Sequence, residues 1–505
     1  MLCESESSVA KSKLRIQYSG LIIFAAQMVS VATGLAFILL LTRNMSKSQY
    51  GIWSNIFDVT AYFTLFSGLI PFWATRFVAR GKEGATKTAF LANLIVAVAA
   101  AAIYIPLTPL ITANLHISST YVAVYMLASA QMITVYTVGT LESCLRAERP
   151  QALGYGLVLE EIVKISLAYV LIVKFQQPFL GAMLSLIFAA SFQILFYLKL
   201  LSKSLQQKIR WSYAREWLKG STAILYNAAG GQLASFIFIL LIIYGTKDGR
   251  ADYAAAATFT GIIGYCAALA TALYPKLLAE DSLKEVTTTL KIVLMFAFPL
   301  TAIIMTMSQS LLTVLNVSYS VASPVLVLLS IDALISLISQ FYASVLYGVE
   351  KLDEEAKIPL RKLVKSKLFK VLSLPYIQAA ITLPTALIIL ARFTNGQPVQ
   401  AAVYVVIINM VAHSITFLLT YLIMRDLVRI TVPWRSIGKY FFASTVTAAA
   451  LYVLPHPETL ARTFVSGLAG AAIYAVLILA IDKDARALVL AILQEIGIGV
   501  KTTNS

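Results

Sequence analysis

The chain has 505 residues, of which 59% are hydrophobic and 13% are charged, and its formal net charge is +16. A soluble domain has roughly 25% charged residues and about 45–50% apolar ones. No soluble core could bury this apolar excess, so the composition excludes a soluble protein and predicts a chain surrounded by lipid.

Apolar runs of about twenty residues, long enough to cross about 30 Å of hydrocarbon, recur from residue 18 to residue 481. The N-terminal segment mixes acids with bases, and the first apolar run is too long for a signal peptide, which predicts a permanent first span. We expect an all-α fold with about fourteen transmembrane helices, because lipid cannot satisfy free backbone groups. The predicted spans are 18–41, 51–73, 87–110, 119–141, 151–173, 178–200, 218–244, 252–275, 288–314, 322–348, 371–391, 399–424, 436–454 and 460–481.

The lysines and arginines predict the orientation of these spans. Of the 40 basic residues, 32 lie at the termini or in every second loop, 7 lie in the opposite loops, among them Lys247 and Arg250, and Lys164 lies inside a span. Basic residues are retained on the cytoplasmic side, so we expect both termini in the cytoplasm and the protein in the plasma membrane. This bias and attraction to anionic lipid headgroups explain the net charge without a nucleic-acid partner.

The hydropathy pattern repeats after about 203 residues, a shift that superposes Tyr50 on Tyr253. Six spans separate the two copies, so both have the same orientation. Parallel repeats of this kind place a substrate site between them near the bilayer midplane, as in transporters. The predicted domains are a six-helix lobe at 1–210, a second six-helix lobe at 211–430, and two further spans with an amphipathic tail at 431–505.

Residues 34–81 carry a resemblance to a known family. The similar elements are Arg43 at the end of the first span, "YG" at Tyr50 and Gly51 with the tryptophan that follows, and "SGL" and "TRFVARG" in the second span. The chain resembles the polysaccharide-transporter (O-antigen flippase-like) family of the multidrug/oligosaccharidyl-lipid/polysaccharide (MOP) exporter superfamily, in these motifs and in its length and span number. The resemblance implies transport of lipid-linked oligosaccharides by alternating access between two lobes. The family often carries an acid near the outer end of the seventh span, which residues 235–245 lack.

Three charges interrupt the predicted span 151–173. Glu160, Glu161 and Lys164 lie roughly 15 Å deep at 1.5 Å per residue, where a lone charge costs at least about 2.5–3.5 kcal/mol. Lys164 is three or four residues from each acid and can neutralise one of them. Two interpretations stay open: an ion pair that locks this helix to a neighbour, or a charged wall of the transport cavity whose surplus carboxylate titrates during the cycle.

Other polar residues in predicted spans are candidates to face the substrate or a coupling ion. Asp58 lies in the second span with Asn55 one turn earlier, Asp332 lies in a span without other charges, and His413 could exchange protons. For each of these residues, a hydrogen bond between helices is the alternative.

The span 218–244 combines Asn227 and Gln232 with the adjacent glycines Gly230 and Gly231. Adjacent glycines can unwind a helix and expose its carbonyl groups to a cavity, or they can allow close helix packing.

Arg76 and Arg80 lie four residues apart at the inner end of the second span. They are candidate contacts for the pyrophosphate of a lipid headgroup, because guanidinium groups suit phosphate. Anchoring on the cytoplasmic side is the alternative.

Motifs of catalysis are missing from the sequence. It contains no GxxxxGK[ST], HExxH or GxSxG pattern, and its histidines and cysteines are scattered. We therefore predict no enzyme, no catalytic residue, no metal site and no cofactor. The predicted function is a flippase for a lipid-linked oligosaccharide or polysaccharide precursor, with a proton or sodium ion as candidate coupling ion. The alternatives are a multidrug or cation antiporter of the same superfamily and an embedded glycan-handling enzyme.

Overall fold

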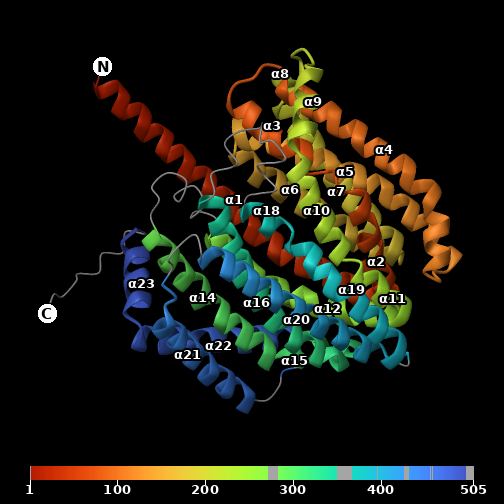
Figure 1. Cartoon of the computed structure of the whole chain (residues 1–505), viewed down its shortest axis with the longest axis vertical. Helices are drawn as coiled ribbons and strands as arrows, with labels where there is room; N and C mark the ends of the chain where they lie inside the picture. The colour runs from red at the N-terminus through yellow and green to blue at the C-terminus, as the bar shows by residue number, and fades with distance from the viewer. Residues whose placement is uncertain are drawn as a thin grey trace. The chain divides into compact units, whose positions relative to one another are not determined.

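The computed structural model describes residues 2–270, 283–349, 367–394, 396–425, 431–454, 457 and 459–495, and every regular element among them is helical (Figure 1). Ten helical segments in this part of the chain are long and apolar enough to cross a membrane. They are Ile22–Asn44, Ala85–Asn114, Ser119–Glu148, Pro178–Leu200, Thr222–Tyr244, Val286–Thr306, Val317–Leu346, Phe369–Phe393, Pro398–Arg425 and Leu460–Ile481. The chain is an all-α, multi-pass membrane protein, as predicted.

The other four predicted spans are also helical, but they are shorter, interrupted or more polar. The first of them is divided between α2 (Lys47–Phe63) and α3 (Leu69–Ala79). The span that carries the three charges is α6 (Gln151–Ala168), which continues as the wider turns of η2 (Tyr169–Lys174). The remaining two correspond to α12 (Thr246–Gly264) with η3 (Tyr265–Ala270), and to α21 (Trp434–Val453).

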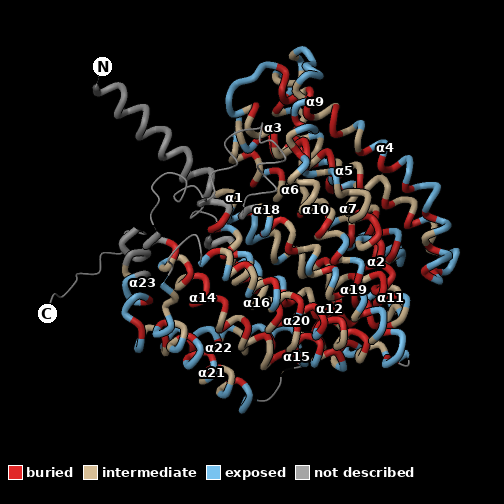
Figure 2. Tube along the Cα trace, viewed as in Figure 1, coloured by how far each residue is buried: buried red, intermediate tan, exposed pale blue. Residues whose placement is uncertain are grey.

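The surface of this fold differs from that of a soluble protein. Large apolar side chains on the flanks of long helices are exposed, such as Ile95 at 58%, Leu110 at 61% and Leu195 at 63%, and Figure 2 shows exposed residues along α4 (Ala85–Asn114). Charged side chains such as Glu161 are buried instead. This pattern fits a surface in contact with lipid.

The chain divides into two compact units. Unit 1 comprises Met1–Ala251 and Glu355–Ala401, and unit 2 comprises Asp252–Glu354 and Ala402–Ser505. Two of the three boundaries between the units therefore fall inside α12 and inside α20 (Pro398–Arg425), and the third lies outside the described residues. The predicted lobes at 1–210 and 211–430, and the predicted domain at 431–505, stay predictions. Residues 351–366 lie outside the described residues, and they include most of the basic residues between the predicted spans 322–348 and 371–391.

Unit 1 packs together helices that are near and far apart in sequence. α1 (Leu2–Asn44) packs on α6, and α6 packs on α7 (Pro178–Leu200), which also contacts α5 (Val122–Glu148). An apolar core in this unit contains Trp73, Phe77 and Trp217, with Trp217 contributed by α9 (Trp211–Gly220). α10 (Thr222–Ala234) and α11 (Ile237–Tyr244) both pack on α19 (Leu374–Phe393).

Unit 2 has its own helix packing. α14 (Leu283–Thr306) contacts α21 and α16 (Ser323–Val349), and α21 contacts α22 (Leu460–Ile481). The unit also contains α15 (Ser308–Leu315). α23 (Lys483–Glu495) follows α22 and corresponds to the predicted amphipathic tail.

Local sequence explains where α2 begins. Ser46 precedes the helix and accepts a hydrogen bond from the Gln49 backbone nitrogen, while the Gln49 side chain accepts one from the Ser46 backbone nitrogen. This reciprocal cap satisfies backbone groups that a helix start leaves free. The cap fixes the beginning of the helix that carries Asn55 and Asp58.

Candidate functional site

A buried ion pair joins α2 to the beginning of α12. Arg250 donates from Nε to Asp58 Oδ2 at 2.7 Å and from Nη2 to Oδ1 at 2.8 Å. The Asp58 and Arg250 side chains are 11% and 10% exposed. The guanidinium carbon also lies 5.1 Å from the centroid of the Phe238 ring. Two parallel charge-assisted hydrogen bonds are the strong form of this contact.

The position of Arg250 corrects the sequence interpretation, which put this residue in a loop. α12 begins at Thr246, several residues before the predicted span, so Arg250 lies in its first turns and is buried. The apolar criterion missed this turn because residues 246–250 are mostly polar. The sequence did hold one signal that a basic residue lies buried nearby: an acid inside a span, such as Asp58, needs a cationic partner.

Asn55 lies one turn before Asp58 and is fully buried. The Tyr125 hydroxyl of α5 donates a hydrogen bond to Asn55 Oδ1 at 2.7 Å. The Tyr104 hydroxyl of α4 donates to the Tyr125 carbonyl oxygen at 2.8 Å. These bonds tie three helices together, as the alternative interpretation of Asn55 expects.

Gln232 reaches the same helix from α10. Its side chain lies beside the Tyr62 hydroxyl, and the Tyr62 ring packs edge-on against Phe236 with centroids 6.4 Å apart. Asn55, Asp58 and Tyr62 follow one another by three or four residues and therefore share one side of α2. The structure thus brings three predicted site residues, Asn55, Asp58 and Gln232, together beside α2. We call these three residues, with Tyr62 and Arg250, the α2 polar cluster.

Glu161 is surrounded by three donors from α1 and α6. Ser30 donates to Oε1 and Thr33 to Oε2, each at 2.6 Å, and Lys164 Nζ lies 2.5 Å from Oε2. Glu161 is 3% exposed. The ion pair with Lys164 lies within α6, whereas the hydrogen bonds from Ser30 and Thr33 join α6 to α1. Together these contacts satisfy the carboxylate locally. The role of the three charges as a cavity wall stays a prediction.

Glu160 is the surplus carboxylate of this group and is partly buried. It lies within electrostatic range of Lys164, Glu161 and Glu142. Glu142, on α5, is near the Gln193 amide nitrogen at 3.5 Å and the Tyr197 hydroxyl at 3.4 Å, both of α7. The sequence interpretation missed Glu142 because the predicted span ended at residue 141, whereas α5 continues to Glu148.

In unit 2, the structure brings together two predicted residues that the sequence considered separately. His413 of α20 lies with Nδ1 2.7 Å from Asp332 Oδ1 of α16, and the Ser336 hydroxyl is 3.2 Å from the same nitrogen. The Asp332 side chain is 7% exposed and that of His413 is 26% exposed. This contact joins α16 to α20 through a carboxylate and an imidazole ring.

Gly230 takes part in the packing of α10 on α19, and Asn227 bonds to the last residue of α18 (Lys367–Leu372). The Asn227 side-chain nitrogen donates to the Leu372 carbonyl oxygen at 3.3 Å. α10 continues through Gly230 and Gly231 without unwinding. A Cβ atom on Gly230 would lie 2.6 Å from the Tyr376 ring, whereas one on Gly231 would meet no atom within 4 Å. Of the two interpretations of the glycines, close packing of helices therefore applies to Gly230.

The two glycines make a matched pair for a stability test. Gly230→Ala is expected to lower the free energy of unfolding by about 1–3 kcal/mol, because the added methyl group must displace Tyr376. Gly231→Ala is expected to leave stability unchanged or slightly higher, since it adds a better helix former in open space. Thermal unfolding of both variants in detergent measures the difference. Equal stability of the two would contradict the close contact with α19.

Arg76 and Arg80, at the end of α3, have different surroundings. The Arg76 guanidinium carbon lies 3.8 Å from the centroid of the Phe72 ring, and the group donates to the Phe72 carbonyl oxygen at 3.0 Å. Arg80 is exposed. Contact of either residue with a lipid headgroup stays a prediction.

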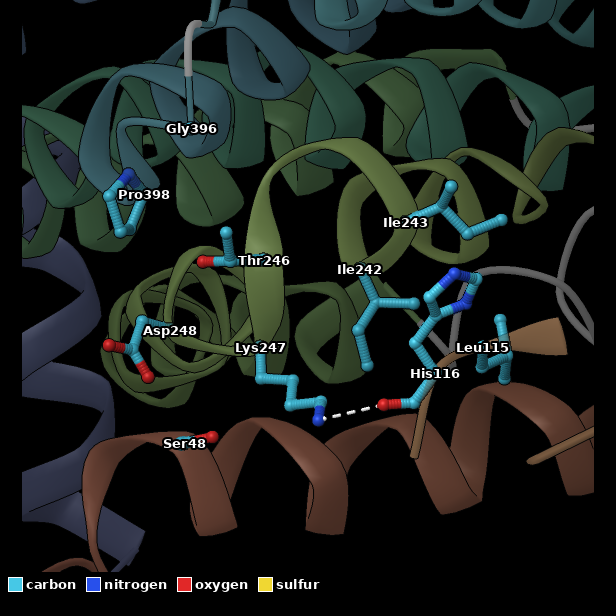
Figure 3. A pocket seen from close by; sticks show the side chains of 10 residues that line it. All are labelled: Ser48, Leu115, His116, Ile242, Ile243, Thr246, Lys247, Asp248, Gly396 and Pro398. Atoms are coloured by element: carbon cyan, nitrogen blue, oxygen red, sulfur yellow. Dashed lines mark hydrogen bonds between the residues drawn. The ribbon is translucent and has the colours of Figure 1, made fainter. Parts of the chain in front are cut away.

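A pocket of about 620 Å³ opens in unit 1 where several helices end or begin, as Figure 3 shows. The sequence interpretation did not find it, because its residues come from four separate predicted loops and span ends. Its volume falls in the range of small-molecule sites. The lining residues are Ser48, Leu115, His116, Ile242, Ile243, Thr246, Lys247, Asp248, Gly396 and Pro398. Within the described part of the chain, no group of three or more His, Cys, Asp or Glu residues is placed to hold a metal ion.

No protein-family model and no curated protein sequence matches this chain. Solved structures do match its fold. An inward-facing multidrug resistance MATE family transporter of the MOP superfamily has a TM-score of 0.63 at 14% sequence identity, with 81% of this chain and 98% of that chain covered. The lipid II flippase MurJ in an inward closed conformation has a TM-score of 0.62 at 13% identity, with 93% and 100% covered.

A further structural match is a MOP superfamily transporter from Pyrococcus furiosus that is described by the reverse polarity of its binding pocket. Its TM-score is 0.53 at 16% identity, with 82% of this chain and 95% of that chain covered. At these identities the likeness concerns the fold. The chain therefore has the fold of MOP superfamily transporters, and the narrower resemblance to polysaccharide transporters stays a prediction.

Proposed function

We propose that this protein is a membrane transporter that flips a lipid-linked oligosaccharide or polysaccharide precursor from the cytoplasmic to the outer leaflet by alternating access. The observation that carries the proposal is the extent of the fold match. The lipid II flippase covers 93% of this chain, whereas the MATE transporter covers 81%, and each is itself matched almost completely. The difference between these two coverages is 12% of 505 residues, or about 60 residues. This is the length of two spans with their connections.

The polar groups inside the helices support this proposal. A glycan has many hydroxyl groups and needs a polar path through the bilayer, which a helix surface in contact with lipid does not provide. The proposed path and ion contacts are Asn55, Asp58, Glu160, Glu161, Lys164, Asn227, Gln232, Asp332 and His413, and the proposed headgroup contacts are Arg76 and Arg80. We place the protein in the plasma membrane with both termini in the cytoplasm, and we assign a proton or sodium ion as the coupling ion.

A second candidate function, antiport of drugs or cations, is favoured by the match to the MATE transporters, which extends over 95–98% of those chains. An embedded glycan-handling enzyme is the third, and the fold match to transporters argues against it.

Reconstituted vesicles separate these functions. The probe is a polyprenyl-pyrophosphate-linked oligosaccharide with a fluorescent label on its sugar, bleached by dithionite added outside. A flippase is expected to bring the probe of the inner leaflet to the outside, so that dithionite bleaches the fluorescence that was protected before. The probe itself should stay chemically unchanged, as mass spectrometry would check. Persistence of the protected fraction, together with proton- or sodium-driven movement of ethidium, would replace the flippase proposal by antiport.

A further inference from the structure

The beginning of α2 lies against the corner between α11 and α12, residues 242–251, which we call the corner segment. A Cβ atom on Gly51 would lie 1.8 Å from the Lys247 carbonyl oxygen and 3.3 Å from the Ala251 backbone nitrogen. Only glycine can occupy position 51, because the backbone of the corner segment takes the place of a side chain. The two segments therefore meet backbone to backbone.

The Asp58–Arg250 ion pair continues this contact. Asp58 follows Gly51 by seven residues and lies about two turns along the same face of α2. Arg250 follows Lys247 by three residues in α12. Separation of α2 from the corner segment would break both hydrogen bonds of the pair and would bring two nearly buried charges into water.

Lys247 makes a third contact, to the connection that follows α4. Its Nζ donates to the His116 carbonyl oxygen at 3.0 Å (Figure 3). His116 and Thr246 have φ angles of 53° and 68°. This left-handed conformation is uncommon for residues with a side chain and persists where the surrounding structure holds it. The corner segment is thus fixed at three points.

The three contacts gather at one end of the helices. They involve α2 from Gly51 to Asp58, the beginning of α12, the end of α11 and the connection after α4. The charge distribution predicts that this end faces outside. α2 and residues 115–118 belong to the first predicted lobe, whereas the corner segment belongs to the second. All of these segments lie in unit 1, and the corner segment ends where unit 2 begins. Opening of the outer end requires α2 and residues 115–118 to separate from the corner segment.

We propose that α2 and the corner segment form an outer gate, that the Asp58–Arg250 ion pair is its latch, and that the structure shows this gate closed. The proposal rests on the proposed transport function, because a protein with fixed helices would have no use for a gate. It assigns Asp58 to the control of access rather than to the substrate.

The test follows the accessibility of α2 from outside. Ser54 is 8% exposed and bonds to the Tyr50 carbonyl oxygen of its own helix, so Ser54→Cys is a small change, made after Cys3, Cys144 and Cys266 are replaced by alanine. A membrane-impermeant maleimide is added to reconstituted vesicles, outside or inside. Asp58→Asn combined with Arg250→Met removes both charges of the pair, so neither partner is left behind as a buried charge and this double variant is expected to fold.

The double variant is expected to raise labelling from the outer side about tenfold over the Ser54→Cys parent, because loss of the latch shifts the population towards the open gate. Exchange of the charges, Asp58→Arg with Arg250→Asp, is expected to return labelling towards the parent value. Arg392→Ala, which removes an exposed basic residue of α19, is the control and should change nothing. Equal labelling of the parent and the double variant would overturn the latch.

The labelling is measured without substrate, so the result does not depend on the identity of the glycan. A failed flipping assay with increased labelling would reject the proposed function and keep the gate. Active flipping with unchanged labelling would keep the function and reject the gate.

Discussion

Replacing Lys164 by methionine is expected to lower the free energy of unfolding by about 3–5 kcal/mol. The substitution leaves the Glu161 carboxylate, which is 3% exposed, without its cationic partner in the membrane interior, and removal of one member of a buried pair has a cost of this size. Denaturant unfolding in detergent micelles measures the effect. Lys174→Met, an exposed lysine at the end of the same helical segment, is the matched control and should cost little.

The double variant Glu161→Gln with Lys164→Met is expected to recover most of this stability, because two uncharged side chains then replace the buried pair. Its transport activity separates the two interpretations of the three charges. If they serve to tie α6 to α1, the double variant transports normally. If they line the cavity, transport or its pH dependence changes although the protein is folded. A Lys164→Met variant as stable as Lys174→Met would contradict the ion pair itself.

Replacing His413 by leucine is expected to cost about 3 kcal/mol of stability, because Asp332 loses its 2.7 Å partner in a site where it is 7% exposed. Ser336→Ala removes the longer contact to the same ring and should cost about 1 kcal/mol. A double-mutant cycle with Asp332→Asn measures the coupling between the two residues. Additive effects of the two substitutions would show that the pair contributes nothing.

A further double variant tests whether the Asp332–His413 pair carries the coupling proton. We expect Asp332→Asn with His413→Gln, which retains side chains able to form hydrogen bonds, to move substrate down its own gradient but to lose any response to an imposed pH gradient. A full response in this variant would assign the pair to helix packing alone. A sodium gradient applied to the same vesicles tests the other candidate ion.

The sequence determined the solvent of this protein and therefore its fold class. Apolar runs long enough to cross a bilayer leave no alternative to helices, since lipid cannot pair with the backbone. It also identified Asp58, Glu161 and Asp332 as charges that need an explanation, because a charge at this depth is costly wherever its partner lies. These conclusions depend on composition and local order, which a single chain displays directly.

Apart from Lys164, the partners of these charges were decided by the tertiary structure. Glu161 is satisfied by Ser30 and Thr33, more than 120 residues earlier in the chain, and Asp58 by Arg250, which hydropathy had assigned to a loop. Helices of similar apolarity pack against one another through shape and small residues such as Gly51. No periodicity in one helix reveals which face of another it meets, so these pairs appear only when the helices are packed.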